Sequence, residues 1–199
     1  HRIQRWAPGS TVRVTVAGGN GSGGGLHQLN NPTNMVIGPD GSMYIVDKGN
    51  NRILKWELGA NNGVIVAGGQ GAGAAGLNQL IGPHGIQVDA AGTMYISDHS
   101  NHCIMRWRPG STIGEIIAGG LGAGSAVAQL HNPQGIGLST GGELYVADYD
   151  NHRIVRFESM GMDTASFRPT ESGLYSAKVF YRNGCNNQTN TIRIGSDTT

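Results

Sequence analysis

Three aspartates stand where carboxylates could do chemistry: Asp47, Asp98 and Asp148 each end a short apolar stretch and lie 51 and 50 residues apart. Carboxylates that converge from several segments can hold calcium. An aspartate before a tight turn also accepts backbone N–H bonds, and here it could pair with Arg52 or Arg153 across a hairpin. The same residue in every repeat is what a structural turn requires, so we interpret these aspartates as structural.

The seven histidines are candidates for a zinc site. His1, His102 and His152 occupy one repeat position, which is Asn51 in the remaining repeat. Side chains one repeat apart belong to different structural units, so they could share an ion only by pointing to a common axis. The sequence provides no set of three histidines at equivalent positions, and we therefore expect no metal, no cofactor and no catalytic residue.

Other site chemistries lack their motifs. The glycine-rich stretch 18–25 has no Gly-Lys-Ser/Thr, so it is not a phosphate-binding loop, and no Gly-x-Ser-x-Gly marks a nucleophilic serine. Fourteen Lys and Arg residues against thirteen Asp and Glu give a net charge of +1, which disfavours nucleic acid as a partner. No apolar run approaches the roughly 18 residues of a membrane-spanning helix.

The elements that would position these residues come from an internal repeat of 50 or 51 residues. The repeat contains an Ala-Gly-Gly, an aspartate, a proline, a tyrosine and an aromatic that ends an Arg-Ile segment; the aromatics are Trp6, Trp56, Trp107 and Phe157. One repeat predicts four short strands at 34–37, 43–47, 51–56 and 63–67, rich in Val, Ile and Tyr and flanked by turn residues. Four short strands per repeat are typical of propeller blades.

The phase of the repeat predicts an all-β chain with two full and two partial antiparallel four-stranded blades. Residues 1–19 provide two strands of one blade, 32–69 and 83–120 provide full blades, and 133–157 provide three strands.

The residues Asp-x-x-Asn-x-Arg-Ile, at 47–53 and 148–154, and the preceding Pro-x-Gly-Ile, at 83–86 and 133–136, resemble NHL repeats. The resemblance covers residues 1–157 and implies an NHL-type β-propeller, which closes with about six blades. Kelch repeats have a similar period but place a Tyr and a Trp sooner after Gly-Gly. We therefore expect an excerpt of a longer propeller, or an open arc completed by self-association with a second chain.

The repeat stops after residue 157, and residues 158–199 form a second segment with a different pattern. Its Pro-Thr-Glu-Ser-Gly-x-Tyr, Asn-Gly-Cys and Thr-Ile-x-Ile resemble the C-terminal half of Ig-like or PKD-like modules of bacterial secreted proteins. The resemblance implies an extracellular or cell-surface location, and places Tyr175 at the tyrosine corner. We expect Cys103 to be half buried and Cys185 exposed, both without a disulfide.

A recognition face is expected where residues vary at a fixed position of an otherwise regular repeat. His84 lies between Pro83 and Gly85 beside the innermost strand, and its equivalents are Thr33 and Gln134. We predict a ligand-binding face formed by Thr33, Asn34, His84 and Gln134, with Gln79, Gln129 and His131 nearby.

The leading hypothesis is a non-enzymatic extracellular binding or scaffold module for a protein, peptide or glycan ligand. The first alternative is a metal-dependent propeller lyase or hydrolase. The second is an RNA-binding NHL propeller, suggested by Arg and Lys residues beside the tryptophans of the third strand.

Overall fold

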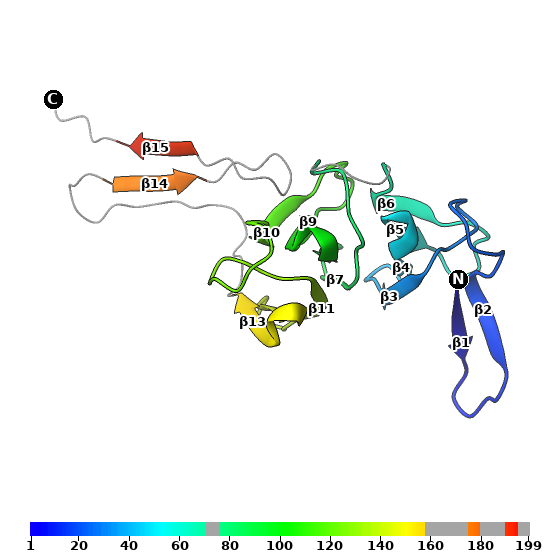
Figure 1. The fold of residues 1–199 in the computed structure, drawn as a ribbon. Helices are drawn as coiled ribbons and strands as arrows, with labels where there is room; N and C mark the ends of the chain where they lie inside the picture. Colours follow the sequence, from blue (N-terminus) through cyan, green and yellow to red (C-terminus); the bar gives the residue numbers. More distant parts are fainter. Residues whose placement is uncertain (71–75, 158–174, 180–189, 195–199) are drawn as a thin grey trace.

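The structure is a computed structural model that describes residues 1–70, 76–157, 175–179 and 190–194. Its strands form four consecutive antiparallel units that follow one another along the chain, and a separate two-stranded sheet (Figure 1). Three-residue 3-10 turns interrupt units two to four, and no α-helix occurs in the described residues.

The first unit pairs β1 (Arg2–Trp6) with β2 (Arg13–Gly18). The second runs in order through β3 (Pro32–Ile37), β4 (Met43–Asp47), β5 (Arg52–Trp56) and β6 (Val64–Gly68). The third contains β7 (Ile86–Val88), β8 (Met94–Asp98), β9 (Cys103–Trp107) and β10 (Glu115–Gly119). The fourth contains β11 (Pro133–Leu138), β12 (Leu144–Asp148) and β13 (Arg153–Phe157). The separate sheet pairs β14 (Tyr175–Val179) with β15 (Asn190–Ile194).

The predicted all-β arrangement of two full and two partial units is confirmed, and the sheets do not close into a ring. The strand predicted at 43–47 has those bounds, whereas the strand predicted from residue 51 begins at Arg52. Asn51 cannot join it because its backbone is left-handed, with φ of 52°, at the end of the 3-10 turn η1 (Lys48–Asn50). The Ig-like resemblance and Cys185 lie largely outside the described residues.

Apolar side chains gather between neighbouring units, because each small sheet has two apolar faces. Trp56 and Trp107 are 2% and 1% exposed, but Trp6, at the same position of the first unit, is 54% exposed. Ile53 and Ile104 are fully buried, while Ile154 in the fourth unit is 68% exposed. Contact with the adjacent unit therefore buries these positions, and the two ends of the described array each leave one face uncovered.

A buried aspartate closes the second strand of each of the last three units. The Oδ1 atoms of Asp47, Asp98 and Asp148 accept the backbone N–H of Asn30, Ile81 and His131 at 2.6, 2.7 and 2.6 Å. Their Oδ2 atoms accept bonds from the amides of Asn50, Asn101 and Asn151. The expected structural role is confirmed, although the N–H donors lie in the segment entering the unit rather than in the turn itself.

The same carboxylate pairs with Arg52 in the second unit and with Arg153 in the fourth, each at 2.7 Å. Arg52 is thus buried, and the expected pairing of the aspartate with Arg52 and Arg153 is confirmed. Cys103 holds the equivalent position in the third unit and is fully buried, so the expectation of half burial was wrong. Cys103 pairs with Asp98 in the strand register as Arg52 pairs with Asp47.

Candidate functional site

The inner strands of units two to four lie side by side and are joined by side-chain hydrogen bonds. Thr33 Oγ1 donates to the carbonyl of His84 at 2.9 Å, and Ser97 Oγ donates to the carbonyl of Gln134 at 2.7 Å. Three of the predicted ligand residues, Thr33, His84 and Gln134, therefore occupy neighbouring inner segments, as the repeat implied. The hydroxyl of Thr33 holds the neighbouring backbone, and Asn34 is exposed on β3.

Next to these segments lie four imidazoles, two from the third unit and two from the connections that enter the third and fourth units. The rings of His84 and His99 stack with centroids 6.0 Å apart, and those of His102 and His131 meet edge to face at 5.5 Å. Lys48 and Asp150 lie beside them: the Lys48 charge acts on His84 and His99, and His131 Nε2 is 3.6 Å from Asp150 Oδ2. We call this set, His84, His99, His102, His131, Lys48 and Asp150, the histidine face.

The 3-10 turns carry half of this face. Lys48 begins η1, His99 begins η2 (His99–Asn101), and Asp150 lies in η3 (Tyr149–Asn151). The turns are pinned to the incoming segments by backbone bonds, such as Ser100 N to the Ile81 carbonyl at 3.1 Å. Side chains from different units are thus held on rigid backbone, as a binding site requires.

A second set of bonds links each unit to the next through the left-handed residue after the turn. Asn51 Oδ1 accepts the N–H of Gly82 at 2.8 Å, and His102 Nδ1 accepts that of Asn132 at 3.2 Å. His1 Nδ1 does the same for Asn31 at 2.9 Å. Since His102 Nδ1 accepts, its ring proton sits on Nε2 in the neutral form, which leaves an N–H donor on the histidine face.

The electrostatics of this face oppose protonation of its imidazoles. Burial, and then the charge of Lys48, lowers the pKa of His84 and of His99 below the usual histidine value. Burial and the neighbouring His131 likewise lower the pKa of His102. Asp150 works in the opposite direction on His99 and His102, but less strongly than burial. Its carboxylate also accepts a bond from Asn132. Burial, Lys48 and the neighbouring rings therefore favour the neutral form of these imidazoles.

The two predicted glutamines lie in the connections between units. Gln129 Nε2 donates to the carbonyl of Leu121, and its Oε1 accepts the N–H of Ala126, so its amide holds its own loop. Gln28 makes the matching bonds in the second unit, to Asn20 and Gly25. Gln79 Oε1 is buried and has no hydrogen-bond partner among the described residues. The ligand-binding role of these glutamines stays a prediction.

Sequence reasoning missed Lys48, His99, His102 and Asp150 as members of this face. The signal that pointed to His84 was variation at a fixed repeat position, and the residue after each buried aspartate shows it too: Lys48, His99 and Tyr149 differ completely in chemistry. Tyr149 is 56% exposed at the start of its turn. The same criterion, applied to the first residue of each 3-10 turn, would have identified Lys48 and His99 from the sequence.

The basic residues of the third strands are largely engaged in ion pairs. Lys55 pairs with Asp40 at 2.6 Å, Arg106 with Glu115 at 2.8 Å and Arg156 with Glu143 at 3.1 Å. A nucleic-acid surface needs cations that are available to phosphates. These pairs weigh against the RNA-binding alternative.

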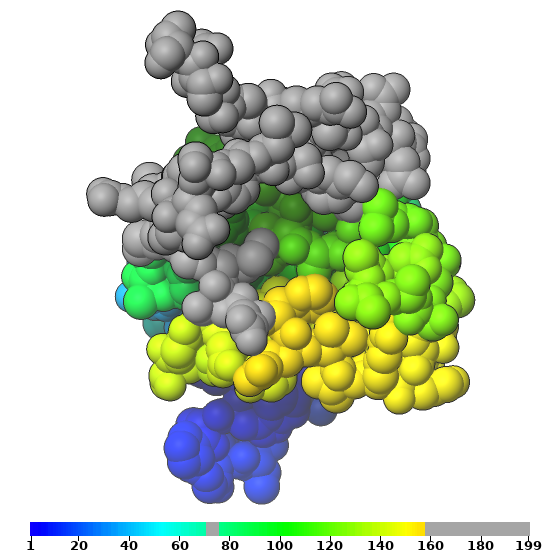
Figure 2. All heavy atoms as spheres, turned by 90° about the vertical axis from the view of Figure 1, so that its left-hand side faces the viewer, coloured from blue at the N-terminus to red at the C-terminus, as the bar shows by residue number. Residues whose placement is uncertain are grey.

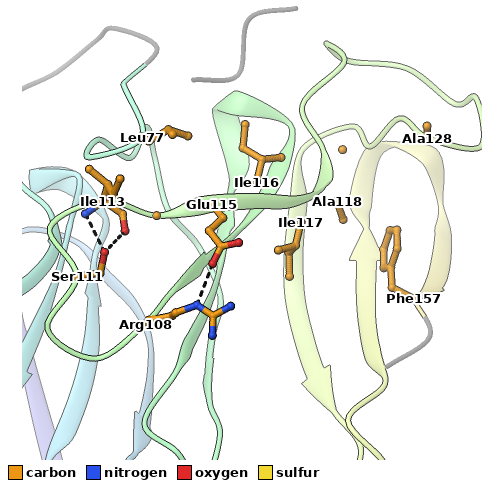
Figure 3. A pocket seen from close by; sticks show the side chains of 12 residues that line it. Leu77, Arg108, Ser111, Ile113, Glu115, Ile116, Ile117, Ala118, Ala128 and Phe157 are labelled. Carbon is orange, nitrogen blue, oxygen red and sulfur yellow. Dashed lines mark hydrogen bonds and ion pairs between the residues drawn. The ribbon is translucent and has the colours of Figure 1, made fainter. Parts of the chain in front are cut away.

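An apolar groove lies away from the histidine face, between β10 and the end of β13 (Figure 3). Ile116, Ile117 and Phe157 line it, and an Arg108–Glu115 ion pair of 3.2 Å lies at one side. Figure 2 shows the fourth unit in yellow beside the green strands of the third. Within 133–157 the fourth unit has three strands, so the groove lies where a full unit would carry a fourth. We attribute this hollow to the shape of the fold.

In the described part of the chain, no group of three or more His, Cys, Asp or Glu side chains is arranged to hold a metal ion. Over the same residues, no helix has the length and apolarity to cross a membrane.

The fold of this chain is similar to that of known proteins. Residues 130–157 match the NHL repeat. An auxiliary nutrient binding protein from Bacteroides thetaiotaomicron is 20% identical, with a TM-score of 0.59 over 78% of this chain and 42% of that protein. A protein of unknown function from the same species is 18% identical, with a TM-score of 0.62 over 78% of this chain and 41% of its own. The chain has the fold of an unclosed β-propeller.

This chain therefore spans less than half the length of these two solved proteins. A virginiamycin B lyase from Staphylococcus aureus is 15% identical over 81% of this chain and 50% of its own, with a TM-score of 0.49. No match was found among curated proteins.

Proposed function

We propose that this chain is a non-enzymatic binding module that holds a protein, peptide or glycan ligand on the histidine face. The observation that supports this proposal most strongly is the grouping of four half-buried imidazoles and Lys48, which come from several segments of the repeat. The backbone that carries them is held by hydrogen bonds between units. We propose that Thr33, Asn34 and Gln134 on the inner strands, and Gln79 and Gln129 in the connections, add contacts to the ligand.

The chemistry of the face suits recognition. Imidazole N–H groups, amides and an ammonium group are hydrogen-bond donors, which match the hydroxyls, carbonyls and carboxylates of sugars and peptides. The rigid frame lowers the entropy cost of binding. One solved propeller of similar fold is a nutrient binding protein, and at 20% identity that likeness supports the architecture rather than a shared ligand.

We further propose that the module works outside the cell, with self-association as a way to complete the ring. The location rests on the resemblance of residues 158–199 to modules of bacterial secreted proteins. Self-association rests on the uncovered faces at the ends of the array, marked by Trp6 and Ile154.

An array of immobilised plant, host and bacterial oligosaccharides would test the binding role. The full chain should retain a defined subset, and the double variant His84→Ala, His99→Ala should lose it while keeping its far-ultraviolet circular dichroism. The matched control is His27→Ala, an exposed histidine outside the face. Mass spectrometry of the retained sugars should find them intact. Cleavage or elimination products would overturn the proposal in favour of the lyase or hydrolase.

A further inference from the structure

The histidine face contains one corner at which two imidazoles and an ammonium group meet, and the carboxylate of Asp150 acts on this corner through His99. His84 and His99 stack at 6.0 Å, and the Lys48 side chain comes within 3.9 Å of the point where a Cβ on Gly82, two residues before His84, would lie. Asp150 lies on the other side of the face, against His131 and Asn132. The corner thus presents two imidazoles and an ammonium group.

The three groups of this corner disfavour one another's positive charge. Lys48 opposes protonation of both rings, and His84 also opposes that of His99. An anion placed between them would turn these repulsions into attractions and would be held by charge-assisted hydrogen bonds. His99 Nδ1 lies 3.4 Å from Ser100 Oγ, so its Nε2 remains for a ligand.

From this geometry we propose that Lys48, His84 and His99 form a subsite for an oxyanion, the carboxylate or phosphate group of an acidic ligand. This inference rests on the proposed binding function and narrows its ligand class. The subsite gains strength as pH falls, because each imidazole that takes up a proton adds a charge facing the anion. His102 contributes a neutral donor, since a proton on its Nδ1 would break its bond from Asn132.

The charged and titratable groups around the rings of His84 and His99 influence how readily each ring takes up a proton. Lys48 faces His84; Lys48, His84, His102 and Asp150 act on His99. Lys48 opposes His99 protonation, and Asp150 acts in favour of it. The net response therefore comes from His84 and His99.

The test is an NMR titration of the full chain that follows the imidazole signals. The probes are sodium glucuronate, inorganic phosphate and, as a neutral match to glucuronate, glucose, each at pH 5.5 and pH 7.5. Glucuronate or phosphate should shift the His84 and His99 signals, and glucose should not. The affinity for glucuronate, whose charge is the same at both pH values, should fall roughly tenfold from pH 5.5 to pH 7.5. Whether glucuronate, phosphate or both bind tells a sugar acid from a phosphate ligand.

Two variants test whether the anion binds at this corner. Lys48→Gln should weaken anion binding by roughly tenfold, which corresponds to one partly screened charge, and His27→Ala should leave it unchanged. Shifts with glucose alone, or array binding limited to neutral sugars, would overturn the oxyanion subsite while leaving the binding function. Absence of array binding together with anion shifts would overturn a glycan ligand while leaving the oxyanion subsite. Shifts that appear only when zinc is added would replace the anion with a metal.

Discussion

The second and third units build the same turn around a buried aspartate, but they complete it with different residues. In the second unit Arg52 pairs with Asp47 and also donates to the carbonyls of Gly24, Gly25 and Gln28. One guanidinium thus ties the turn to the glycine-rich connection. In the third unit this position is Cys103, which has no charge.

The bonds common to both units show what the turn itself requires. Asp98 keeps its bonds from Ile81 N–H and from the Asn101 amide, at 2.7 Å each. These favour its ionised form, but burial outweighs them and raises the pKa of Asp98 to about 6. The comparison indicates that the amide and backbone bonds suffice to shape the turn, and that the arginine supplies charge compensation and an anchor for the loop.

The largest effect is expected from Arg52→Ala. The Asp47 and Arg52 side chains are fully buried and 5% exposed, so the variant leaves a buried carboxylate without its cation and frees three loop carbonyls. We expect a loss of about 3 to 5 kcal/mol in the free energy of unfolding, measured by urea denaturation at pH 7. A loss below about 1 kcal/mol would show that the amide bonds alone carry the turn.

The second prediction concerns pH and the third unit. Folding raises the pKa of Asp98 from 3.8 to about 6, so between these values the native protein holds a proton that the unfolded chain has released. Unfolding then releases a proton, and this site's stability, full below pH 3.8, falls by about 3 kcal/mol as pH rises through 6.

Urea denaturation from pH 3.5 to pH 7 should show this loss in the wild type, superimposed on the titration of other groups. The Asp98→Asn variant should lack it, because an amide does not titrate. A wild-type and a variant profile that run parallel would contradict the raised pKa.

Local turn chemistry is the part of this fold that the sequence predicts well. The strand at 43–47 and the aspartate turns follow from residues close together in sequence and repeated in register. The histidine face is different: His84 meets His99, and His102 meets His131, because of how one unit sits against the next. That relative placement depends on the apolar faces between units, which a repeat period does not specify. Variation at fixed positions identified His84 but did not reveal its neighbours.

Arg153→Ala gives a third, smaller test of what burial contributes. Arg153 pairs with Asp148 at 2.7 Å and donates to the carbonyls of Ser125, Ala126 and Gln129, as Arg52 does in its own unit. Its side chain is 34% exposed, against 5% for Arg52, so water can replace part of what is lost. We expect a loss of about 1 to 2 kcal/mol in the same denaturation experiment. A loss equal to that of Arg52→Ala would mean that exposure does not set the strength of this turn.

The smallest effect is expected from placing the arginine of the second unit into the third. In Cys103→Arg a guanidinium would face Asp98, so the pKa of Asp98 should fall below about 6, and Asp98 would be ionised with a partner at pH 7. The gain in unfolding free energy should be only about 1 kcal/mol, because burying the new cation offsets most of the Coulomb attraction.

Carbon-13 NMR of the Asp98 carboxyl measures the pKa directly. Cys103→Ala is the control, since it removes the thiol without adding charge and should leave the pKa raised. If the pKa of Asp98 stays near 6 in Cys103→Arg, the lack of a cation does not explain the raised pKa. The shape of the third unit's interior would then be its cause.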